Sequence, residues 1–144
     1  MRSMRTVTIL IPCYNEEDSL PPLFERMNRL ITSHLNDTIY SLLFVDDGSS
    51  DTTKKQIKKY SDSHPFADYI FLSRNFGKEK AMYAGICNVN TDALVIIDAD
   101  LQDPPELIPN MIDLWKQGYD DVYARRRKRS GETVFKTLTS HWYY

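Results

Sequence analysis

Short apolar runs rich in β-branched residues alternate along the chain with longer segments whose apolar residues recur at helical spacing. A short apolar run predicts a buried strand, and helical spacing predicts a helix with one buried face. The first run, which is rich in β-branched residues, ends at Pro12, as expected of a buried strand. The predicted strands are residues 6–11, 39–45, 69–72, 93–97 and 121–124.

The segments between the strands carry signals for helix starts and ends. Asp18 or Ser19 is expected to cap a helix that opens with Pro21-Pro22, where a missing N–H costs nothing. Asp103 has the same expected role before Pro104-Pro105, and Gly118 ends that helix. The first helix has the apolar face Leu23, Phe24, Met27, Leu30 and Ile31, and the other predicted helices cover residues 52–60, 78 to about 88, 104 to 118 and 132–144.

Regular alternation of strands and helices indicates an α/β fold, a Rossmann-like, mostly parallel sheet with helices on both faces. In such a fold the carboxyl ends of the strands lie at one edge of the sheet, where ligands bind. The small residues Ala81, Ala84 and Gly85 suit close approach of their helix to the sheet. We expect one domain over residues 1–130, with 131–144 as the start of an acceptor or membrane-interface region of a longer protein. The loops expected to converge are 12–17, 46–51, 74–78, 98–103 and 125–129.

Composition narrows the class of protein. The 144 residues are 42% hydrophobic and 26% charged, which is enough for one packed domain. A net charge of -2 gives no general attraction to nucleic acid, although residues 125–129 form a dense basic run. Two cysteines are too few for a disulfide scaffold, and we expect a reducing compartment and a soluble chain. No apolar stretch has the length that a bilayer span needs.

The loops that follow the predicted strands mix acidic and basic residues. Asp98 and Asp100 stand one residue apart at the end of a strand, where two carboxylates can hold Mg²⁺ or Mn²⁺ and leave positions open for a phosphate. Arg74 and Lys78 are candidate phosphate ligands, because a metal-bound diphosphate needs acids for the ion and bases for the phosphates. The chain has no Walker loop, no G-x-G-x-x-G and no zinc-type Cys/His spacing.

Four segments together resemble the family 2 inverting glycosyltransferases, and more narrowly the polyprenyl-phosphate glycosyltransferases, which include bactoprenol glucosyltransferases and, more distantly, dolichol-phosphate mannose synthases. The resemblance implies a type A glycosyltransferase fold that binds a nucleoside-diphosphate sugar. It covers nearly the whole chain, in order. The segments are Ile9-Leu-Ile-Pro-Cys-Tyr-Asn-Glu-Glu17, Val45-Asp-Asp-Gly-Ser-Ser-Asp51, Arg74-Asn-Phe-Gly-Lys-Glu79 and Asp98-Ala-Asp-Leu-Gln-Asp-Pro-Pro-Glu106.

The resemblance also implies roles for residues at matching positions. Asp100 would hold the metal most directly, and Arg126, with help from Arg129, would lie near the transferred phosphates, in a register open by one residue. Asp46 or Asp47 would accept a hydrogen bond from the base. The remaining implied contacts are Pro12, Tyr14 and Glu16 around the nucleoside and Asp98 and Gln102 at the metal and ribose-diphosphate.

The implied reaction transfers a hexose, with UDP-glucose favoured as donor, to a polyprenyl phosphate at the cytoplasmic face of a membrane, for modification of the cell envelope. Three alternatives remain at this point. A family 2 enzyme with a polysaccharide or teichoic-acid acceptor would find its base beyond residue 144. A sugar-phosphate nucleotidyltransferase would need a Gly-rich loop after the first strand. A receiver-type signalling module would bind Mg²⁺ at Asp46, Asp47 and Asp98.

Overall fold

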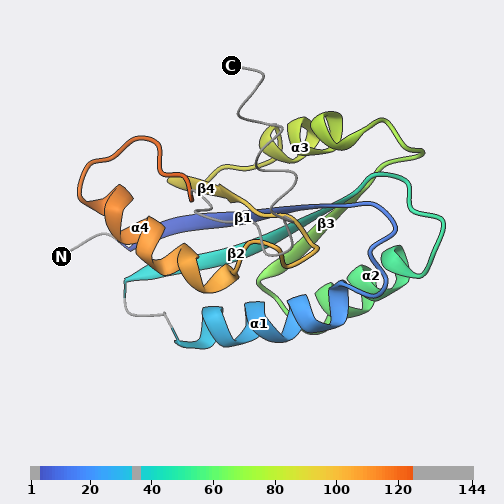
Figure 1. The fold of residues 1–144 in the computed structure, drawn as a ribbon, viewed down its shortest axis with the longest axis horizontal. Helices are drawn as coiled ribbons and strands as arrows, with labels where there is room; N and C mark the ends of the chain where they lie inside the picture. Colours follow the sequence, from blue (N-terminus) through green and yellow to red (C-terminus); the bar gives the residue numbers. More distant parts are fainter. Residues whose placement is uncertain (1–3, 34–36, 125–144) are drawn as a thin grey trace, which may run out of the picture. The chain divides into compact units, whose positions relative to one another are not determined.

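The structure, a computed structural model, describes residues 4–33 and 37–124. The chain divides into two units, Met1–Pro109 and Asn110–Tyr144. The first unit contains a four-stranded parallel sheet with the strand order β3-β2-β1-β4 (Figure 1). Its strands are β1 (Arg5–Cys13), β2 (Thr38–Asp46), β3 (Ala67–Phe71) and β4 (Ala93–Ile96).

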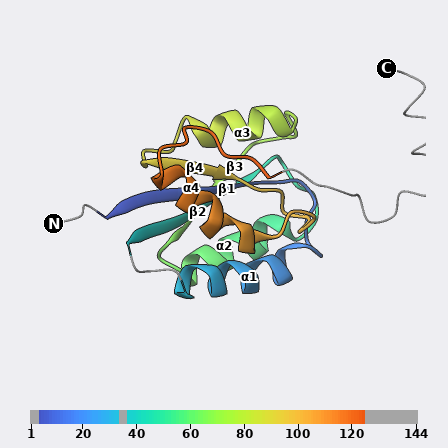
Figure 2. The same ribbon diagram turned by 60° about the vertical axis from the view of Figure 1, so that its left-hand side comes forward.

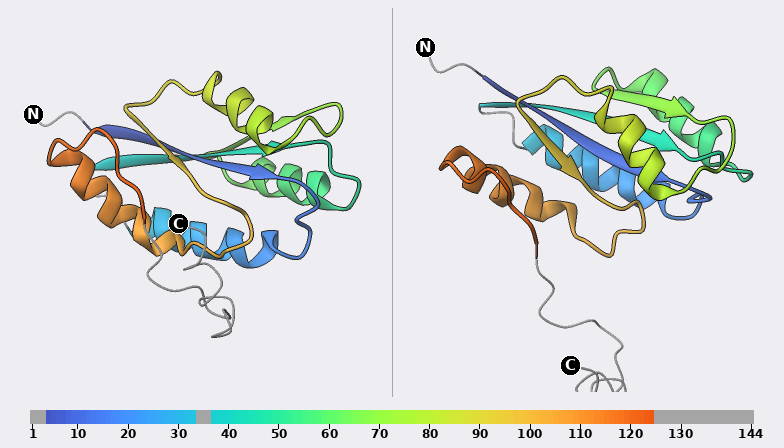
Figure 3. Two further views of the ribbon diagram at one scale, coloured as in Figure 1. Left: turned by 45° about the horizontal axis from the view of Figure 1, so that its top comes forward. Right: turned by 90° about the horizontal axis from the view of Figure 1, so that it is seen from above.

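Helices cover both faces of this sheet, as the alternating pattern predicted. Helices α1 (Leu20–Ser33) and α2 (Thr53–Ser63) lie on one face, and α3 (Lys78–Ile86) lies on the other (Figures 1 and 2). The view from above in Figure 3 shows α3 over the sheet, where it contacts β1 and β2. A 3₁₀ turn, η1 (Pro105–Leu107), leads into α4 (Ile108–Lys116), which runs from the first unit into the second.

The core of the first unit has a layer on each side of the sheet. On the α3 side, Leu10 and Val45 pack with Ala81. A Cβ added at Gly85 would lie 2.3 Å from Leu10 Cδ1, so the predicted close approach of the helix to the sheet is confirmed for Ala81 and Gly85, the two buried residues of α3. On the other side, the Phe24 ring of α1 stacks on Tyr60 of α2 with centroids 4.1 Å apart. Both layers bury apolar area that holds the helices to the sheet.

The ends of the strands are not level, and this creates the site. β1 pairs with β2 as far as Cys13 opposite Asp46, whereas its pairing with β4 ends at Leu10 opposite Ile96. The end of β1 therefore continues past β4. The chain also changes direction here, because β2 and β3 build one side of β1 and β4 builds the other. A point where strand order reverses is where open parallel sheets bind ligands.

Two predictions near the end of the described chain were wrong. Residues 121–124 form no strand, and the Tyr123 side chain is 79% exposed. Strands need a hydrogen-bonding partner, and the short run Val122-Tyr-Ala124 pairs with none of the described strands. The helix expected from Pro104 begins as the 3₁₀ turn, and its N-cap residue is Pro104, where Asp103 was expected. Gly118, at φ 106°, follows the end of α4 as predicted. The expected helix at 132–144 lies outside the described residues.

Candidate donor-binding cleft

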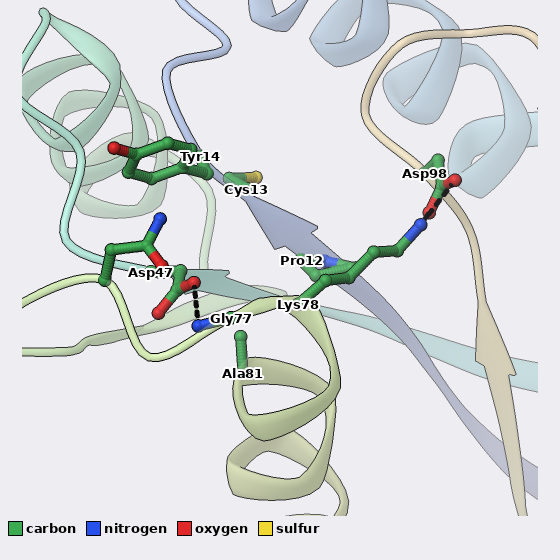
Figure 4. A pocket seen from close by; sticks show the side chains of 9 residues that line it. Pro12, Cys13, Tyr14, Asp47, Gly77, Lys78, Ala81 and Asp98 are labelled. Atoms are coloured by element: carbon green, nitrogen blue, oxygen red, sulfur yellow. Dashed lines mark hydrogen bonds and ion pairs between the residues drawn. The ribbon is translucent and has the colours of Figure 1, made fainter.

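A cleft opens at the carboxyl edge of the sheet, within the first unit (Figure 4). The space between its walls, including the open mouth, is about 510 Å³. Four of the five loops predicted to converge do meet around this edge, and the fifth, 125–129, lies outside the described residues. The lining residues are Pro12, Cys13, Tyr14, Asp47, Asn75, Gly77, Lys78, Ala81 and Asp98.

The loop after β1 is fastened to the loop after β2 by side-chain hydrogen bonds. Asn15 adopts a left-handed conformation, φ 53°, and its Oδ1 accepts the Ser50 N–H at 2.9 Å. The Asn15 N–H donates to Ser49 Oγ at 2.8 Å. Glu17 Oε2 accepts from the Thr52 N–H at 3.0 Å and the Thr52 hydroxyl at 2.7 Å. These bonds fix the backbone that follows Tyr14, a residue that is 46% exposed and borders the cleft.

Asp46, at the end of β2, is fully buried beneath the cleft. Its Oδ2 accepts the N–H groups of Gly48 and Ser49 at 3.1 and 3.0 Å, and Lys54 Nζ lies 3.7 Å away. Its Oδ1 has no hydrogen-bond partner among the described residues. Asp46 therefore organises the turn after β2, and it is not among the residues that line the cleft.

Asp47 does line the cleft, and it holds the entry to α3. Its Oδ1 accepts the Phe76 N–H at 2.7 Å. Its Oδ2 accepts the Gly77 N–H at 2.8 Å, the bond drawn in Figure 4. Its own N–H donates to the Cys13 carbonyl at 2.8 Å. One residue thus joins the ends of β1 and β2 to the start of α3. Each Asp47 oxygen retains a second lone pair that can accept from a ligand.

Gly48 allows the loops after β2 and β3 to touch. Its φ is +75°, and an added Cβ would lie 2.3 Å from the carbonyl carbon of Arg74. Arg74, predicted to bind phosphate, is not among the lining residues. Its guanidinium lies 4.2 Å from the centroid of the Phe76 ring, an arrangement that favours cation–π attraction.

An ion pair crosses the cleft between α3 and the loop after β4. Lys78 Nζ lies 2.6 Å from Asp98 Oδ1 and 2.7 Å from Oδ2 (Figure 4). The Asp98 carboxylate thus already holds one cation, with both oxygens turned toward it. Asp100, two residues on, is exposed and does not line the cleft; its Oδ1 accepts the Gln102 N–H at 3.0 Å, across Leu101 at φ 59°.

The acidic loop fits a divalent cation in its donor chemistry. Asp98 and Asp100 offer carboxylate oxygens one residue apart, and the ammonium at Asp98 is a stand-in for a metal ion. No group of three or more His, Cys, Asp or Glu residues able to hold a metal occurs in the described part of the chain. Mg²⁺ commonly binds through one or two carboxylates with the remaining positions taken by phosphates and water, so two acids are sufficient.

Two features of the first unit were not predicted from the sequence: an ion pair and a buried thiol. The Arg26 guanidinium of α1 forms a forked ion pair with Glu106, its Nε donating to Oε1 at 2.8 Å, and this anchors the far end of the acidic loop. The Cys13 thiol is buried in the cleft wall, and burial, together with the charges of Glu16 and Asp46, raises its pKa well above its ordinary value. The ion pair joins residues that are 80 positions apart in the sequence, and the shifted pKa of the thiol depends on its burial, so neither could be read from a local pattern.

The predicted site residues thus fall into groups. Arg126 and Arg129 lie outside the described residues. Glu16 is half-buried beside the cleft, where its N–H donates to Thr53 Oγ1 at 2.8 Å, and it does not line the cleft. The residues brought together in the cleft are Pro12, Tyr14, Asp47, Lys78 and Asp98, and those outside its lining are Glu16, Asp46, Arg74, Asp100 and Gln102.

Comparison with known proteins establishes the family. Residues 8–144 match the family described as "Glycosyl transferase family 2". The chain is 49% identical, over 96% of its length, to an uncharacterized glycosyltransferase of Synechocystis sp., of which it covers 43%. It is 36% identical over 96% of its length to a prophage bactoprenol glucosyl transferase homolog of Escherichia coli, covering 44% of that protein. It is 41% identical over 92% of its length to an undecaprenyl-phosphate 4-deoxy-4-formamido-L-arabinose transferase of Proteus mirabilis, covering 40%.

A solved structure supports the same fold. Glucosyl-3-phosphoglycerate synthase of Mycobacterium tuberculosis, in complex with Mn²⁺, uridine diphosphate and glucosyl-3-phosphoglycerate, superposes with a TM-score of 0.60 at 22% identity. The match covers 77% of this chain and 39% of that one.

The parallel sheet with its cleft at the strand-order reversal, together with the family match over residues 8–144, places the chain in the class of glycosyltransferases. The chain belongs to glycosyl transferase family 2. The family match sets aside the receiver-type and nucleotidyltransferase alternatives. The chain spans less than half the length of the curated relatives described above. None of the described helices combines the length and the apolar character needed to cross a bilayer.

Proposed function

We propose that the cleft binds the nucleoside diphosphate of a sugar donor and that the whole protein transfers the sugar to a polyprenyl phosphate. The observation that carries the proposal is that Tyr14, Lys78 and Asp98 line one cleft at the strand-order reversal. The cleft offers an aromatic ring, a cation and a carboxylate to one ligand. The relatives named for bactoprenol and undecaprenyl phosphate support the lipid-phosphate acceptor.

The nucleoside end of the donor is assigned to the β1 side of the cleft. The exposed ring of Tyr14 gives a base a surface to stack on. Pro12 contributes a rigid wall, and Asp47 retains lone pairs for a base N–H. UDP-glucose is the favoured donor, because the chain is similar to a bactoprenol glucosyl transferase homolog.

The diphosphate end is assigned to the acidic loop and to Lys78. Asp98, Asp100 and Gln102 would hold Mg²⁺ or Mn²⁺ there, and the ion when bound would neutralise charge on the departing diphosphate. Lys78 would share that task, as would Arg126 and Arg129 in the chain beyond the described residues. Fixed positive groups aimed at developing negative charge are a large source of rate enhancement.

The acceptor decides whether a base is needed. A lipid phosphate is already anionic at neutral pH, so its oxygen can attack the anomeric carbon directly and invert it. A sugar hydroxyl on a polysaccharide or teichoic acid would first have to lose a proton to a base. The proposal therefore assigns no general base to this chain, and it places the whole protein against a membrane surface that supplies the lipid.

Calorimetric titration of the chain with UDP, GDP and ADP, with and without Mn²⁺, tests the donor site. We expect one nucleotide to bind more tightly with Mn²⁺ than without, and Tyr14→Ala to weaken it about tenfold through lost stacking. Tyr83→Ala is the matched control, because Tyr83 is an exposed tyrosine of α3 that does not line the cleft. Absence of binding by every nucleotide in the presence of Mn²⁺ contradicts the proposal.

The acceptor is tested with the whole protein in vesicles that contain polyprenyl phosphate. Transfer of labelled glucose from UDP-glucose to the lipid is the expected result, and Asp100→Ala is expected to abolish the metal-dependent rate. Near wild-type transfer by that variant refutes the assigned role of Asp100. Transfer only to a soluble glycan chain refutes the lipid acceptor and leaves the donor site intact.

A further inference from the structure

We infer that Lys78 is an exchangeable counterion: it neutralises Asp98 while the cleft is empty and moves to the diphosphate when the donor binds. The inference rests on the proposed donor site and adds a positioning role for one residue. Its basis is the ion pair across the cleft, with Lys78 Nζ within 2.7 Å of both Asp98 oxygens. Figure 4 shows the extended Lys78 side chain reaching from the start of α3 past Pro12 to Asp98.

The position of Lys78 does not favour its charge by itself. Lys78 is the first residue of α3, and a positive charge at a helix N-terminus opposes the helix dipole. The Phe76 and Gly77 N–H groups before α3 already donate to Asp47, which is fixed in the wall of the cleft. Asp98 is the anion that the Lys78 ammonium contacts. The ammonium is therefore balanced by a group that the donor site also needs.

The pair is built so that it can open. Both side chains are well exposed, Lys78 at 56% and Asp98 at 41%, and ion pairs this open to solvent are weak. Asp47, by contrast, is only 3% exposed, and its carboxylate accepts hydrogen bonds from backbone N–H groups. The flexible side chain of Lys78 lets the ammonium turn from Asp98 into the cleft that both residues line without any change in the backbone.

Exchange keeps the charges of the cleft paired in both states. In the empty cleft, the Lys78 ammonium occupies the oxygens of Asp98 that would hold a divalent cation. With a nucleoside diphosphate present, the ammonium has two phosphoryl groups to contact, and Asp98 becomes available to the cation that those phosphates carry. Cation and nucleotide should consequently bind with positive coupling, and the coupling must be reciprocal.

Removing the ammonium gives opposite effects on the two ligands. In Lys78→Gln, the Asp98 carboxylate has no competing cation, so Mn²⁺ alone should bind about two- to tenfold more tightly. UDP at saturating Mn²⁺ should bind several-fold more weakly, because the phosphates lose a cation. A lysine with a merely structural role would not tighten binding of the metal.

The experiment measures free Mn²⁺ by its electron paramagnetic resonance signal during titration of the chain, and UDP by calorimetry at saturating Mn²⁺. Lys80→Gln is the matched control, because it removes the same charge from the first turn of the same helix and Lys80 does not line the cleft. Circular dichroism checks that each variant is folded. The expected result is a tighter Mn²⁺ site in Lys78→Gln than in both wild type and Lys80→Gln.

Equal Mn²⁺ affinity in the two glutamine variants overturns the inference, as does a weaker Mn²⁺ site in Lys78→Gln. A tighter Mn²⁺ site with unchanged UDP affinity also overturns it, because the ammonium then does not move to the diphosphate. Failure of the wild-type chain to bind UDP, GDP or ADP with Mn²⁺ instead refutes the proposed donor site. The two failures are therefore distinguishable in one set of titrations.

Discussion

Asp47 Oδ2 accepts the Gly77 N–H at 2.8 Å, so that a protein carboxylate lies at the start of α3. Helix N-termini attract anions, because their first N–H groups are unpaired and the helix dipole is positive there. In this chain the anion is internal, and its other oxygen accepts the Phe76 N–H. The loop before α3 is thereby set in place before any phosphate arrives.

Asp47→Asn should destabilise the chain by about 1–3 kcal/mol, because an amide has one accepting oxygen in place of two and carries no charge. Asp68→Asn makes the same chemical change at an exposed position of β3, and it should alter the unfolding free energy by less than about 0.5 kcal/mol. Urea denaturation measures both. Equal small effects would show that the Asp47 bonds to the N–H groups contribute nothing net.

Gly48→Ala should cost about 2 kcal/mol or more, because it adds a collision to an unfavourable backbone conformation. The new Cβ would lie 2.3 Å from Arg74 backbone, which cannot swing aside as a side chain can. Gly118→Ala separates the two effects: Gly118 has φ +106° but no atom within 4 Å of the added Cβ. We expect about 1 kcal/mol for it in the same urea experiment. A Gly48 variant no less stable than the Gly118 variant contradicts the close loop contact.

The sequence predicted most of the fold because its apolar pattern is locally consistent. The run at residues 6–11 is β-branched and becomes β1, whose interior residues Ile9 and Leu10 are fully buried. The same reasoning failed at 121–124. A run of three apolar residues does not specify whether a neighbouring strand is available to pair with it, and pairing is a property of the whole sheet.

For the site, the sequence predicted which loops meet but not which atoms bond. The sequence indicates Lys78 as a phosphate ligand and Asp98 as a metal ligand. It does not predict their contact with each other, because that contact depends on side chains that approach across the cleft. Asp46 and Asp47 look equivalent in the sequence. The end of β2 places one beneath the sheet edge and the other in the cleft, a difference that only the register of the strand decides.

The Arg26–Glu106 pair should stabilise the chain by about 0.5–1 kcal/mol at neutral pH and low salt, since the pair is partly exposed and screened. The hydrogen bond from Arg26 lowers the pKa of Glu106 below its ordinary value of 4.5. A lowered folded-state pKa contributes stability that is present above about pH 4.5 and lost as pH falls through the lowered value. The unfolding free energies of wild type and Arg26→Ala should therefore converge in that acidic range.

A double-mutant cycle isolates this pair. Arg26→Ala, Glu106→Gln and the double variant are compared by urea denaturation at neutral pH and again at an acidic pH below the lowered pKa of Glu106. The coupling should be present in the first condition and absent in the second. If the coupling free energy is unchanged when Glu106 is protonated, it comes from packing of the Arg26 side chain and not from the attraction between the two charges.

The two cysteines should differ sharply in reactivity. Cys87 is exposed, and Cys13 is 2% exposed in the cleft wall. The thiolate is the reactive form, and burial, followed by the charges of Glu16 and Asp46, raises the pKa of Cys13. With a disulfide reagent at pH 8, the chain should show one fast thiol and one slower by a factor on the order of a hundred or more. Cys87→Ser should remove the fast phase alone.

Nucleotide should slow the labelling of Cys13 further. The reagent reaches this buried thiol only when the packed wall of the cleft loosens, and a ligand that binds the packed form opposes that loosening. The same measurement on Cys87→Ser with UDP and Mn²⁺ checks this without interference from the exposed thiol. Labelling of Cys13 as fast as that of Cys87 would place its thiol outside the packed wall. In the wild-type chain, a nucleotide effect on Cys87 but none on Cys13 would place the ligand near the carboxyl end of α3, away from the end of β1.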